Sequence, residues 1–240
     1  MNRHFILVCR AVSNMEENEM TLFSRRAAGG LAAVAGLVLA MSAPSLAQSQ
    51  NYKEDMIRDP QQLVQSLRAG GYNIVVRHGA TFSNQADTNP FNFEDVANQR
   101  NLNDKGKDLA KAFGDAIRGI AVPVGEVYTS KFNRAYETAV LAGFEDIKRT
   151  VDLTEGGLVV TPDENNRRAE ALRGMLTRAP EKGKNNVMIT HKPNIIDALG
   201  KDWFDVKEGE ASIFKPEGGK YRLVARVQMD DWPKLAISAH

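Results

Sequence analysis

The stretch YNIVVRHG at residues 72–79 decides the fold, because it joins a short apolar run to an abrupt change in polarity. Its first five residues, 72–76, are rich in β-branched side chains and follow two glycines, which predicts a buried strand. Similar short runs stand at residues 126–129 (EVYT) and 187–190 (VMIT). Three buried strands of this kind, widely separated along the chain, are typical of a sheet with helical connections.

Helical patterns fill the segments between these runs. They cover residues 51–70, a stretch that starts at 103 or 104, residues 132–142, residues 164–178 and a short segment after Pro193. Asn103 or Asp104 is expected to cap the second of these helices. Near the end of the chain, residues 212–215 and 221–227 flank the turn sequence PEGG and predict a hairpin. The alternation predicts an α/β fold, a three-layer sandwich with a mainly parallel central sheet flanked by helices.

The composition is that of an ordinary globular protein and excludes several classes. Of the 240 residues, 42% are hydrophobic and 25% are charged, which argues against disorder. The formal net charge of +1 lacks the basic excess on which nucleic-acid binders depend, so we expect no nucleic-acid partner. One Cys and four His leave too few ligands for a Cys-rich or His-rich metal centre, and we expect no metal and no cofactor.

The first 47 residues differ from the rest of the chain. The apolar stretch LAAVAGLVLAM at residues 31–41 follows Arg25 and Arg26 and precedes small residues that end at Ala47. This order of basic, apolar and small residues predicts a secretory signal peptide, by the general or the twin-arginine route. The stretch is shorter than the roughly 20 residues that span a bilayer, so we expect cleavage after Ala47 and no stable membrane anchor. The residues before Met20 fit neither a signal nor a domain, which favours Met20 as the start.

Removal of this leader changes the chemistry of the remaining chain. It takes away four basic and three acidic residues together with Cys9, so residues 48–240 are formally neutral and free of thiols. A thiol-free chain suits an oxidising compartment, and we therefore expect a periplasmic or secreted protein. No internal boundary separates two cores, which predicts a single domain over residues 48–240. The sequence does not specify an oligomeric state.

Polar residues follow three of the predicted strands at their carboxyl ends. Arg77 and His78 come directly after residues 72–76, Ser130 and Arg134 follow 126–129, and His191 follows 187–190. The carboxyl ends of parallel strands line one crevice, where ligands of such sheets bind. Each residue alone can be structural, but two guanidinium and two imidazole groups in one crevice predict an anion site, and arginine is suited to bidentate capture of phosphate oxygens.

Three segments also carry a family resemblance. VVRHGAT at residues 75–81, SKFNRAYETA at 130–139 and VMITHKPN at 187–194 resemble, in order and spacing, the signatures of the histidine phosphatase superfamily. The resemblance extends over nearly the whole chain after the leader. It implies a phosphoglycerate mutase-like fold and phosphoryl transfer through an intermediate on a histidine.

The resemblance implies a role for each matching residue. His78 is the expected nucleophile, and Arg77, Arg134 and His191 complete the phosphate pocket. A histidine attacks through a neutral ring nitrogen, so its other nitrogen must hold a proton, and the carbonyl of Gly79 is expected to accept it.

Three smaller residues near the same motifs have two interpretations each. Thr81 and Asn84 match positions that can add hydrogen bonds to the phosphate, and both can equally form a turn. Ser130 can contact the phosphate or cap the helix that follows it.

The acid that protonates the leaving alcohol has several candidates. Glu155, in a Leu-Thr-Glu setting, fits the mutase-like branch of the family, and Glu208 precedes a strand expected beside the pocket. Glu210 and Asp163 rank behind these two. The acid-phosphatase branch has an Asp directly after the second histidine, where this chain has Lys192. The sequence does not choose among these carboxylates.

The leading functional hypothesis is an exported, metal-independent phosphomonoesterase that acts on a small phosphorylated substrate through a phosphohistidine on His78. The alternatives are a non-catalytic protein that binds phosphate or a sugar phosphate, a phosphotransferase like the phosphoglycerate mutases, and a surface interaction module. The sequence leaves the physiological substrate open.

Overall fold

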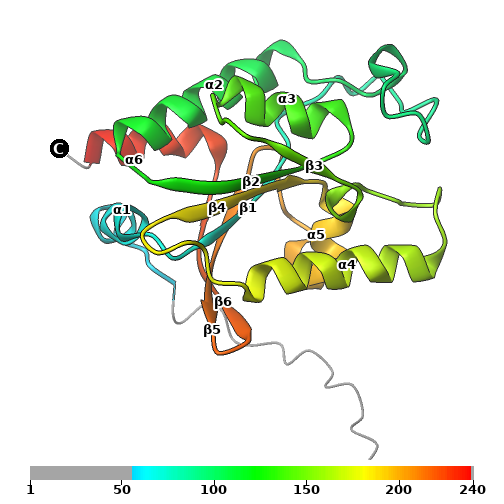
Figure 1. Cartoon of the computed structure of the whole chain (residues 1–240). Coiled ribbons are helices and arrows are strands. Elements are labelled where there is room, and N and C mark those ends of the chain that lie inside the picture. Colours follow the sequence, from blue (N-terminus) through cyan, green and yellow to red (C-terminus); the bar gives the residue numbers. More distant parts are fainter. Residues whose placement is uncertain (1–55, 239–240) are drawn as a thin grey trace, which may run out of the picture. The chain divides into compact units, whose positions relative to one another are not determined.

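Six strands form a single mixed sheet in the order β3-β2-β4-β1-β5-β6 (Figure 1). The computed structural model describes residues 56–238, all of which belong to the unit Gln48–His240. The predicted leader at residues 1–47, with Cys9, lies outside the described residues. The strands span Asn73–Arg77 (β1), Val124–Ser130 (β2), Lys148–Thr150 (β3), Asn185–Thr190 (β4), Ala211–Glu217 (β5) and Lys220–Val227 (β6).

The four strands from β3 to β1 run parallel, and the hairpin β5–β6 completes the sheet. β4 pairs in parallel with both β1 and β2, and β5 pairs antiparallel with β1. The predicted hairpin is confirmed, but Pro216 and Glu217 belong to β5 and not to the turn, which is made by the two glycines that follow. Proline is tolerated there because β5 pairs with β1 only over Ala211 to Phe214, so no partner on that side needs its missing N–H.

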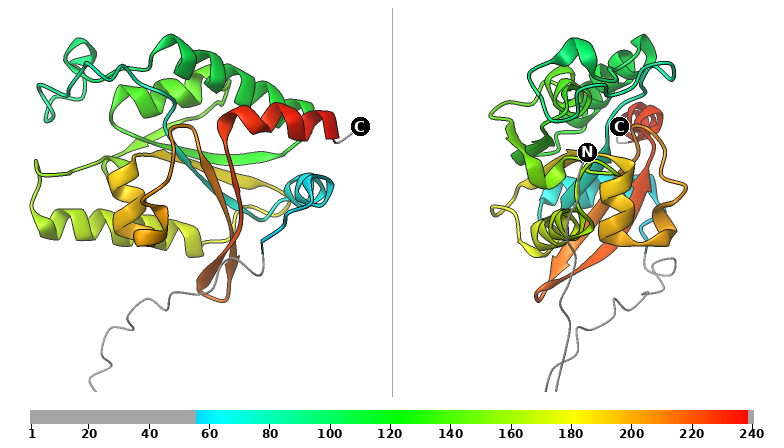
Figure 2. Two further views of the ribbon diagram at one scale, coloured as in Figure 1. Left: turned by 180° about the vertical axis from the view of Figure 1, so that it is seen from behind. Right: turned by 90° about the vertical axis from the view of Figure 1, so that its right-hand side faces the viewer.

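Helices cover both faces of this sheet (Figures 1 and 2). On one face α2, α3 and α6 lie over β1, β2 and β4; on the other lie α4 and α5. The helices span Pro60–Ala69 (α1), Asp104–Gly119 (α2), Asn133–Leu141 (α3), Pro162–Thr177 (α4), Lys192–Leu199 (α5) and Trp232–Ser238 (α6). The predicted α/β architecture, a mainly parallel sheet between helical layers, is confirmed.

Alternation along β1 divides the core between these layers. Ile74 and Val76 are buried in the cluster that contains α1, α2, α3 and α6, whereas Val75 is buried in the cluster that contains α4 and α5. Successive side chains of a strand point to opposite faces, so one short apolar run supplies both cores. This explains why residues 72–76 read as a continuous apolar segment instead of an alternating one.

Helix boundaries follow the capping residues. The Asn103 side chain accepts a hydrogen bond from Gly106 N at 2.9 Å, so Asn103, of the two candidates, caps α2. The prediction of helix over residues 51–70 is wrong for residues 56–59: α1 begins at Pro60 behind the capping Asp59, because proline favours the first helical position. Residues 51–55 lie outside the described residues.

Two elements were not predicted. β3 consists of only three residues, Lys148–Thr150, and is polar because it forms an edge of the sheet. α6, Trp232–Ser238, is short, and its Trp232 is fully buried beside Phe113 of α2, with ring centroids 5.1 Å apart. Neither element carries a periodic apolar pattern long enough to stand out in the sequence.

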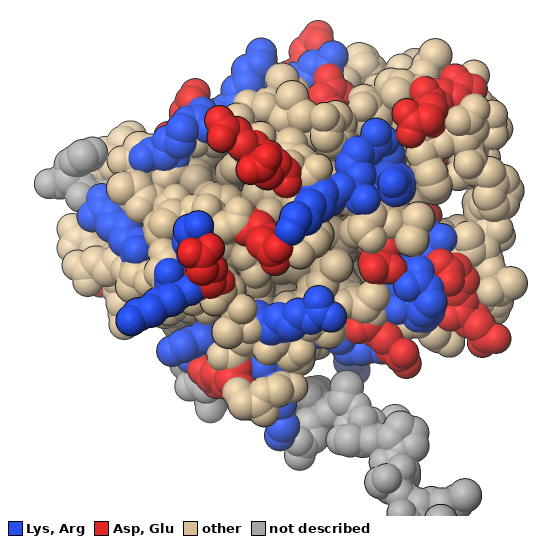
Figure 3. Space-filling view, viewed as in Figure 1, with Lys and Arg blue, Asp and Glu red and all other residues tan. Residues whose placement is uncertain are grey.

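Charges of both signs are mixed on one face of the molecule. On the face seen in Figure 3, basic and acidic side chains are interspersed, and neither positive nor negative side chains form a large continuous patch. Among the helices of the described residues, none has the length and apolar character needed to cross a membrane.

Candidate functional site

The site lies at the carboxyl ends of β1, β4 and β2. Arg77 ends β1 and pairs in register with Thr190, the last residue of β4, so His78 and His191 are the next residues of two neighbouring parallel strands. Their ring centroids are 5.1 Å apart. Arg134, from the first turn of α3 after β2, reaches His191 with its Nε 3.3 Å from Nδ1. Residues far apart in the sequence are thus brought together because parallel strands end at one edge.

The loop after β1 holds His78 in one orientation. The Nδ1 atom of His78 lies 2.8 Å from the carbonyl oxygen of Gly79. A carbonyl can only accept, so Nδ1 carries the hydrogen and Nε2 keeps the lone pair. The N–H of Gly79 donates to Thr138 Oγ1 at 3.1 Å, which ties the loop to α3.

A glycine of α2 allows this loop to pack closely. A Cβ on Gly106 would lie only 2.1 Å from the carbonyl oxygen of Ala80. Because glycine has no Cβ, the backbone at the start of α2 approaches Ala80 more closely than it could with any other residue at position 106. Gly106 is thus part of what positions the imidazole.

The surroundings of both imidazoles favour the neutral form. His78 and His191 are almost completely buried. Burial lowers the pKa of each well below its usual value, and the positive charge of Arg134 lowers both pKa values further. The Gly79 hydrogen bond raises the pKa of His78, but burial outweighs it. A neutral His78 with its proton on Nδ1 has a nucleophilic Nε2.

His191 has the opposite tautomer. Its Nδ1 accepts from Arg134 Nε, so its hydrogen is on Nε2, which lies 2.7 Å from Ser130 Oγ. Ser130 Oγ also accepts from the N–H of Phe132 at 3.0 Å. Ser130 therefore orients His191 and does not cap α3, whose N-cap is Phe132.

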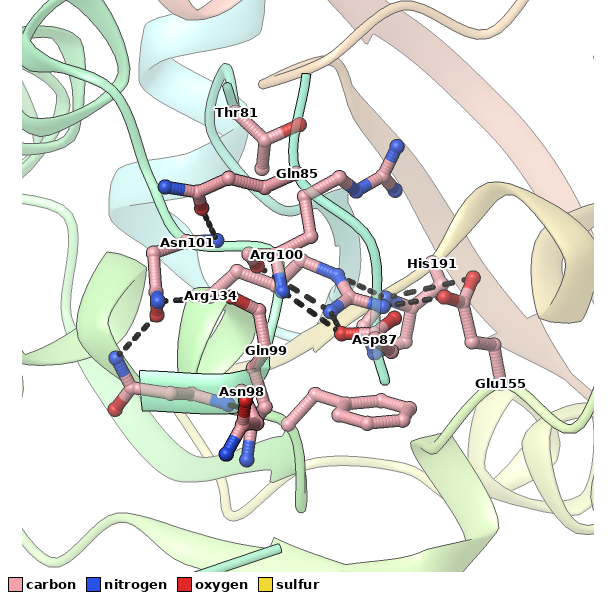
Figure 4. Close-up of polar contacts among 12 residues, drawn as sticks. Thr81, Gln85, Asp87, Asn98, Gln99, Arg100, Asn101, Arg134, Glu155 and His191 are labelled. Atoms are coloured by element: carbon pink, nitrogen blue, oxygen red, sulfur yellow. Dashed lines mark hydrogen bonds and ion pairs between the residues drawn. The ribbon is translucent and has the colours of Figure 1, made fainter. Parts of the chain in front are cut away.

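Arg134 is the centre of the polar network (Figure 4). Its guanidinium is fully buried, lies 4.4 Å from the centre of the Phe132 ring, and donates from Nη1 to Asp87 Oδ1 at 2.9 Å. Its Nη2 forms an ion pair with Glu155 Oε1. Two carboxylates thus hold the donors with which a planar guanidinium would bind two phosphate oxygens.

Arg77 lies on the other side of the site with one donor unused. Its Nη1 donates to the carbonyl oxygen of Val206 at 2.8 Å, and its Nη2 lies 3.6 Å from Glu208 Oε1. Its Nε is buried and has no hydrogen-bond partner among the described residues. A buried donor without an acceptor is unfavourable by about 1–3 kcal/mol, and an oxyanion would satisfy it.

The four candidate acids fall into two groups. Glu155 contacts Arg134 and has Oε2 3.8 Å from His191 Nδ1, and Glu208 lies beside Arg77, so both belong to the site. Glu210 is buried in an ion pair with Arg226 and serves the fold. Asp163 is exposed in the first turn of α4, where an acidic side chain favours the helix N-terminus.

Of Thr81 and Asn84, only Thr81 lies at the site. Thr81 is buried and donates from Oγ1 to Glu208 Oε1 at 2.8 Å, so it borders the site. Asn84 is exposed in a turn, and within the described residues its side chain makes no hydrogen bond to the other site residues. The chain turns away after Thr81 because Thr81 pairs with Leu102 in an isolated bridge. The structure therefore does not bring Asn84 into the site.

Asp87, which the sequence did not indicate as a site residue, contacts Arg134 from the loop of residues 81–101. The N–H of Arg100 donates to Asp87 Oδ1 at 2.9 Å, and the carbonyl oxygen of Arg100 lies 3.4 Å from Arg134 Nη1. Gln85 and Asn101 stiffen the same loop through a side chain-to-backbone hydrogen bond of 2.9 Å (Figure 4). Asp87 stands in a run of polar residues, and nothing in its local sequence distinguishes it from its neighbours.

A pocket of about 530 Å³ adjoins the site on the outer side of the two carboxylates. Asp87, Glu155 and Phe132 form the wall that it shares with the site. Within the described residues, no group of three or more His, Cys, Asp or Glu side chains is arranged to hold a metal ion.

Residues 74–157 match the family model described as histidine phosphatase superfamily, branch 1. No curated protein matches the chain. Similar solved structures include the protein histidine phosphatase SixA complexed with tungstate, with 17% identity, a TM-score of 0.47 and coverage of 67% of this chain and 98% of that one. A mutant phosphoserine phosphatase from Entamoeba histolytica in complex with phosphoserine has 15% identity, a TM-score of 0.45 and coverage of 66% and 97%. A mycobacterial glucosyl-3-phosphoglycerate phosphatase complexed with VO3 has 16% identity, a TM-score of 0.46 and coverage of 64% and 97%.

The family match starts within β1 and ends two residues after Glu155. It therefore includes His78 with its loop, Arg134 and the two carboxylates that pair with Arg134. His191 follows outside the matched residues, at the end of the neighbouring parallel strand. Over residues 74–157 the chain is therefore similar to the histidine phosphatase superfamily, branch 1.

Proposed function

We propose that this protein is a phosphomonoesterase that cleaves phosphate esters through a phosphohistidine on His78. One observation carries the proposal: His78 Nδ1 lies 2.8 Å from the Gly79 carbonyl oxygen, which leaves Nε2 as the nucleophile, and the centre of the His78 ring lies 5.1 Å from that of His191. Phosphoryl transfer needs mainly positioning and positive charge around the phosphate, and Arg77 and Arg134 supply that charge.

In the first step the phosphate takes the place of the carboxylates on Arg134. Asp87 and Glu155 mimic its oxygens in the free protein, since both accept from the Nη atoms of this guanidinium. His78 Nε2 attacks phosphorus, a P–N bond forms and the P–O bond to the alcohol breaks. Glu155, once released from Arg134, takes the proton of the bound phosphate monoanion and donates it to the departing oxygen.

In the second step water attacks the phosphohistidine. A P–O bond forms and the P–N bond breaks. The water proton passes through Glu155 to the departing phosphate, which leaves the carboxylate ready to pair with Arg134 again. One ester and one water give one alcohol and one inorganic phosphate. His191, held by Ser130, accepts a hydrogen bond from Arg134 Nε, which supports a role in orienting this guanidinium toward the phosphate.

The decisive experiment is hydrolysis of para-nitrophenyl phosphate by the purified protein in the presence of EDTA, between pH values of about 4 and 8. We expect product release that His78→Ala abolishes, and an acid-labile phosphoenzyme. Loss of activity with the chelator would contradict metal independence. Phosphate binding without turnover would instead support a non-catalytic binding protein, and transfer to an added alcohol in preference to water would support a phosphotransferase.

The role of Glu155 is testable through the leaving group. Para-nitrophenolate leaves without protonation, whereas an alkoxide does not, so Glu155→Gln should reduce turnover of an alkyl phosphate by about 100-fold and that of para-nitrophenyl phosphate far less. Asp163→Asn is the matched control, because it removes an exposed carboxylate outside the site. A larger leaving-group dependence for Glu208→Gln than for Glu155→Gln would transfer the role to Glu208.

We also propose that the protein is exported, with cleavage after Ala47 and a periplasmic or secreted location. The basic, apolar and small residues in order before Ala47 and the absence of cysteine after Cys9 support this proposal. Fractionation of cells that express the full chain, followed by N-terminal sequencing, tests it. Recovery of uncleaved protein in the cytoplasm would contradict it.

A further inference from the structure

The pocket beside the site is walled mostly by apolar side chains. Six of them are Phe91, Phe93, Phe132, Val159, Val160 and Pro193. Two large apolar side chains of this wall face solvent, since Phe91 is 73% exposed and Val159 is 45% exposed. Large exposed apolar groups that line a concave surface are characteristic of a ligand site.

The pocket is continuous with the groups that would hold the phosphate. Phe132 contributes to the pocket wall and lies edge-on to the His191 ring, with centroids 5.6 Å apart. The same ring lies under the Arg134 guanidinium and contacts Phe93 edge-on at 5.3 Å. Glu155, the proposed acid, is also part of the wall. An ester oxygen beside Glu155 would therefore direct its carbon chain into the apolar pocket.

The charges on the wall disfavour an anionic leaving group. The ionisable residues that line the pocket are Asp87, Glu155 and Arg168. Arg168 is only 8% exposed, and it donates from Nε to Glu164 and from Nη1 to the carbonyl oxygen of Thr154, each at 2.8 Å. A second phosphate or a carboxylate in this pocket would meet two acidic side chains and one cation that is largely buried and engaged elsewhere.

We propose that the preferred substrates are phosphate monoesters of uncharged apolar alcohols, with an alkyl chain or an aromatic ring in this pocket. The inference rests on the proposed phosphatase function, because it assigns the leaving group of that reaction. Apolar surface that leaves water on binding contributes in proportion to its area, so longer chains should react faster until the pocket is filled.

The test compares straight-chain alkyl phosphates from ethyl to hexyl. We expect kcat/KM to rise about three- to fourfold for each added methylene. The 5-carboxypentyl ester, which matches the hexyl ester in length but carries a terminal carboxylate, should react about tenfold more slowly than the hexyl ester.

Two variants of the pocket wall and one control variant next to the wall test the role of the pocket. Val159→Ser and Phe91→Ser should lower the hexyl-to-ethyl ratio of kcat/KM, because both side chains line the pocket. Leu158→Ser should leave this ratio unchanged, because Leu158 is fully exposed and is not among the residues that line the pocket. Since all three positions face solvent, these variants are expected to fold.

The outcomes separate this inference from the proposed function. Turnover that depends on His78 but does not rise with chain length would overturn the inference and leave the phosphatase in place. A hexyl-to-ethyl ratio of kcat/KM that is equal in Val159→Ser, Phe91→Ser and the unchanged protein would also overturn the inference and leave the phosphatase in place. Absence of His78-dependent turnover with every ester would overturn the proposed function itself.

Discussion

Replacement of Asp87 by asparagine is expected to strengthen phosphate binding. In the free protein the Asp87 carboxylate accepts from Arg134 Nη1 at 2.9 Å, so a phosphate oxygen must displace it before it can use the same donor. Asparagine has nearly the same shape and can still accept from the N–H of Arg100, which keeps the loop in place. The substitution removes only the charge that competes with the phosphate.

The magnitude follows from the difference between two hydrogen bonds. A hydrogen bond to a charged acceptor is about twice as strong as one to a neutral amide, a net difference of about 1 kcal/mol after solvent screening. Screening is needed here because the Asp87 side chain is 18% exposed. A change of 1 kcal/mol corresponds to a dissociation constant for phosphate that is about fivefold lower.

Isothermal titration calorimetry with inorganic phosphate measures this change directly. The control is Asp163→Asn, which removes the same charge at an exposed helix terminus away from the site and should leave the dissociation constant unchanged. Phosphate affinity that is unaltered or weaker in Asp87→Asn would refute the view that this carboxylate occupies the phosphate position.

Two further predictions concern stability. The pKa values of His78 and His191 are lowered in the folded state, so the unfolded chain binds more protons below a pH of about 6.5. As the pH decreases below this value, the free energy of unfolding should fall by about 1.4 kcal/mol per pH unit for each histidine. Urea denaturation from pH 7.5 to 5.5 measures this fall, and His191→Asn should remove about half of it. A free energy of unfolding that depends on pH as strongly in His191→Asn as in the unchanged protein would contradict the prediction. Gly106→Ala should lower both the melting temperature and the activity, because its Cβ would lie only 2.1 Å from the Ala80 carbonyl oxygen. Thermal unfolding and hydrolysis of para-nitrophenyl phosphate measure the two effects. Gly174→Ala, at a helical position with open space, should instead be neutral or stabilising by about 0.5–1 kcal/mol.

Local patterns predicted the elements on which the site is built. The buried strands were recognisable because a strand that supplies two cores must be apolar along its length, as Val75 and its neighbours are. Asn103 was one of two caps that the sequence allowed, and the hydrogen bond to Gly106 distinguished it from the other. Such features depend on a few adjacent residues, so they are visible before folding.

The sequence by itself determined the chemistry that this protein can offer: two guanidinium and two imidazole groups, each placed at the end of a strand, directly after it or in the helix turn that follows it. Only the tertiary structure decided how those groups are used. Asp87 is 47 residues from Arg134 along the chain and meets it through a loop held by many weak hydrogen bonds. Asn84, three residues away, fits the motif better and stays outside the site. Contacts of this kind depend on the path of the whole loop, and no short pattern of residue types encodes that path.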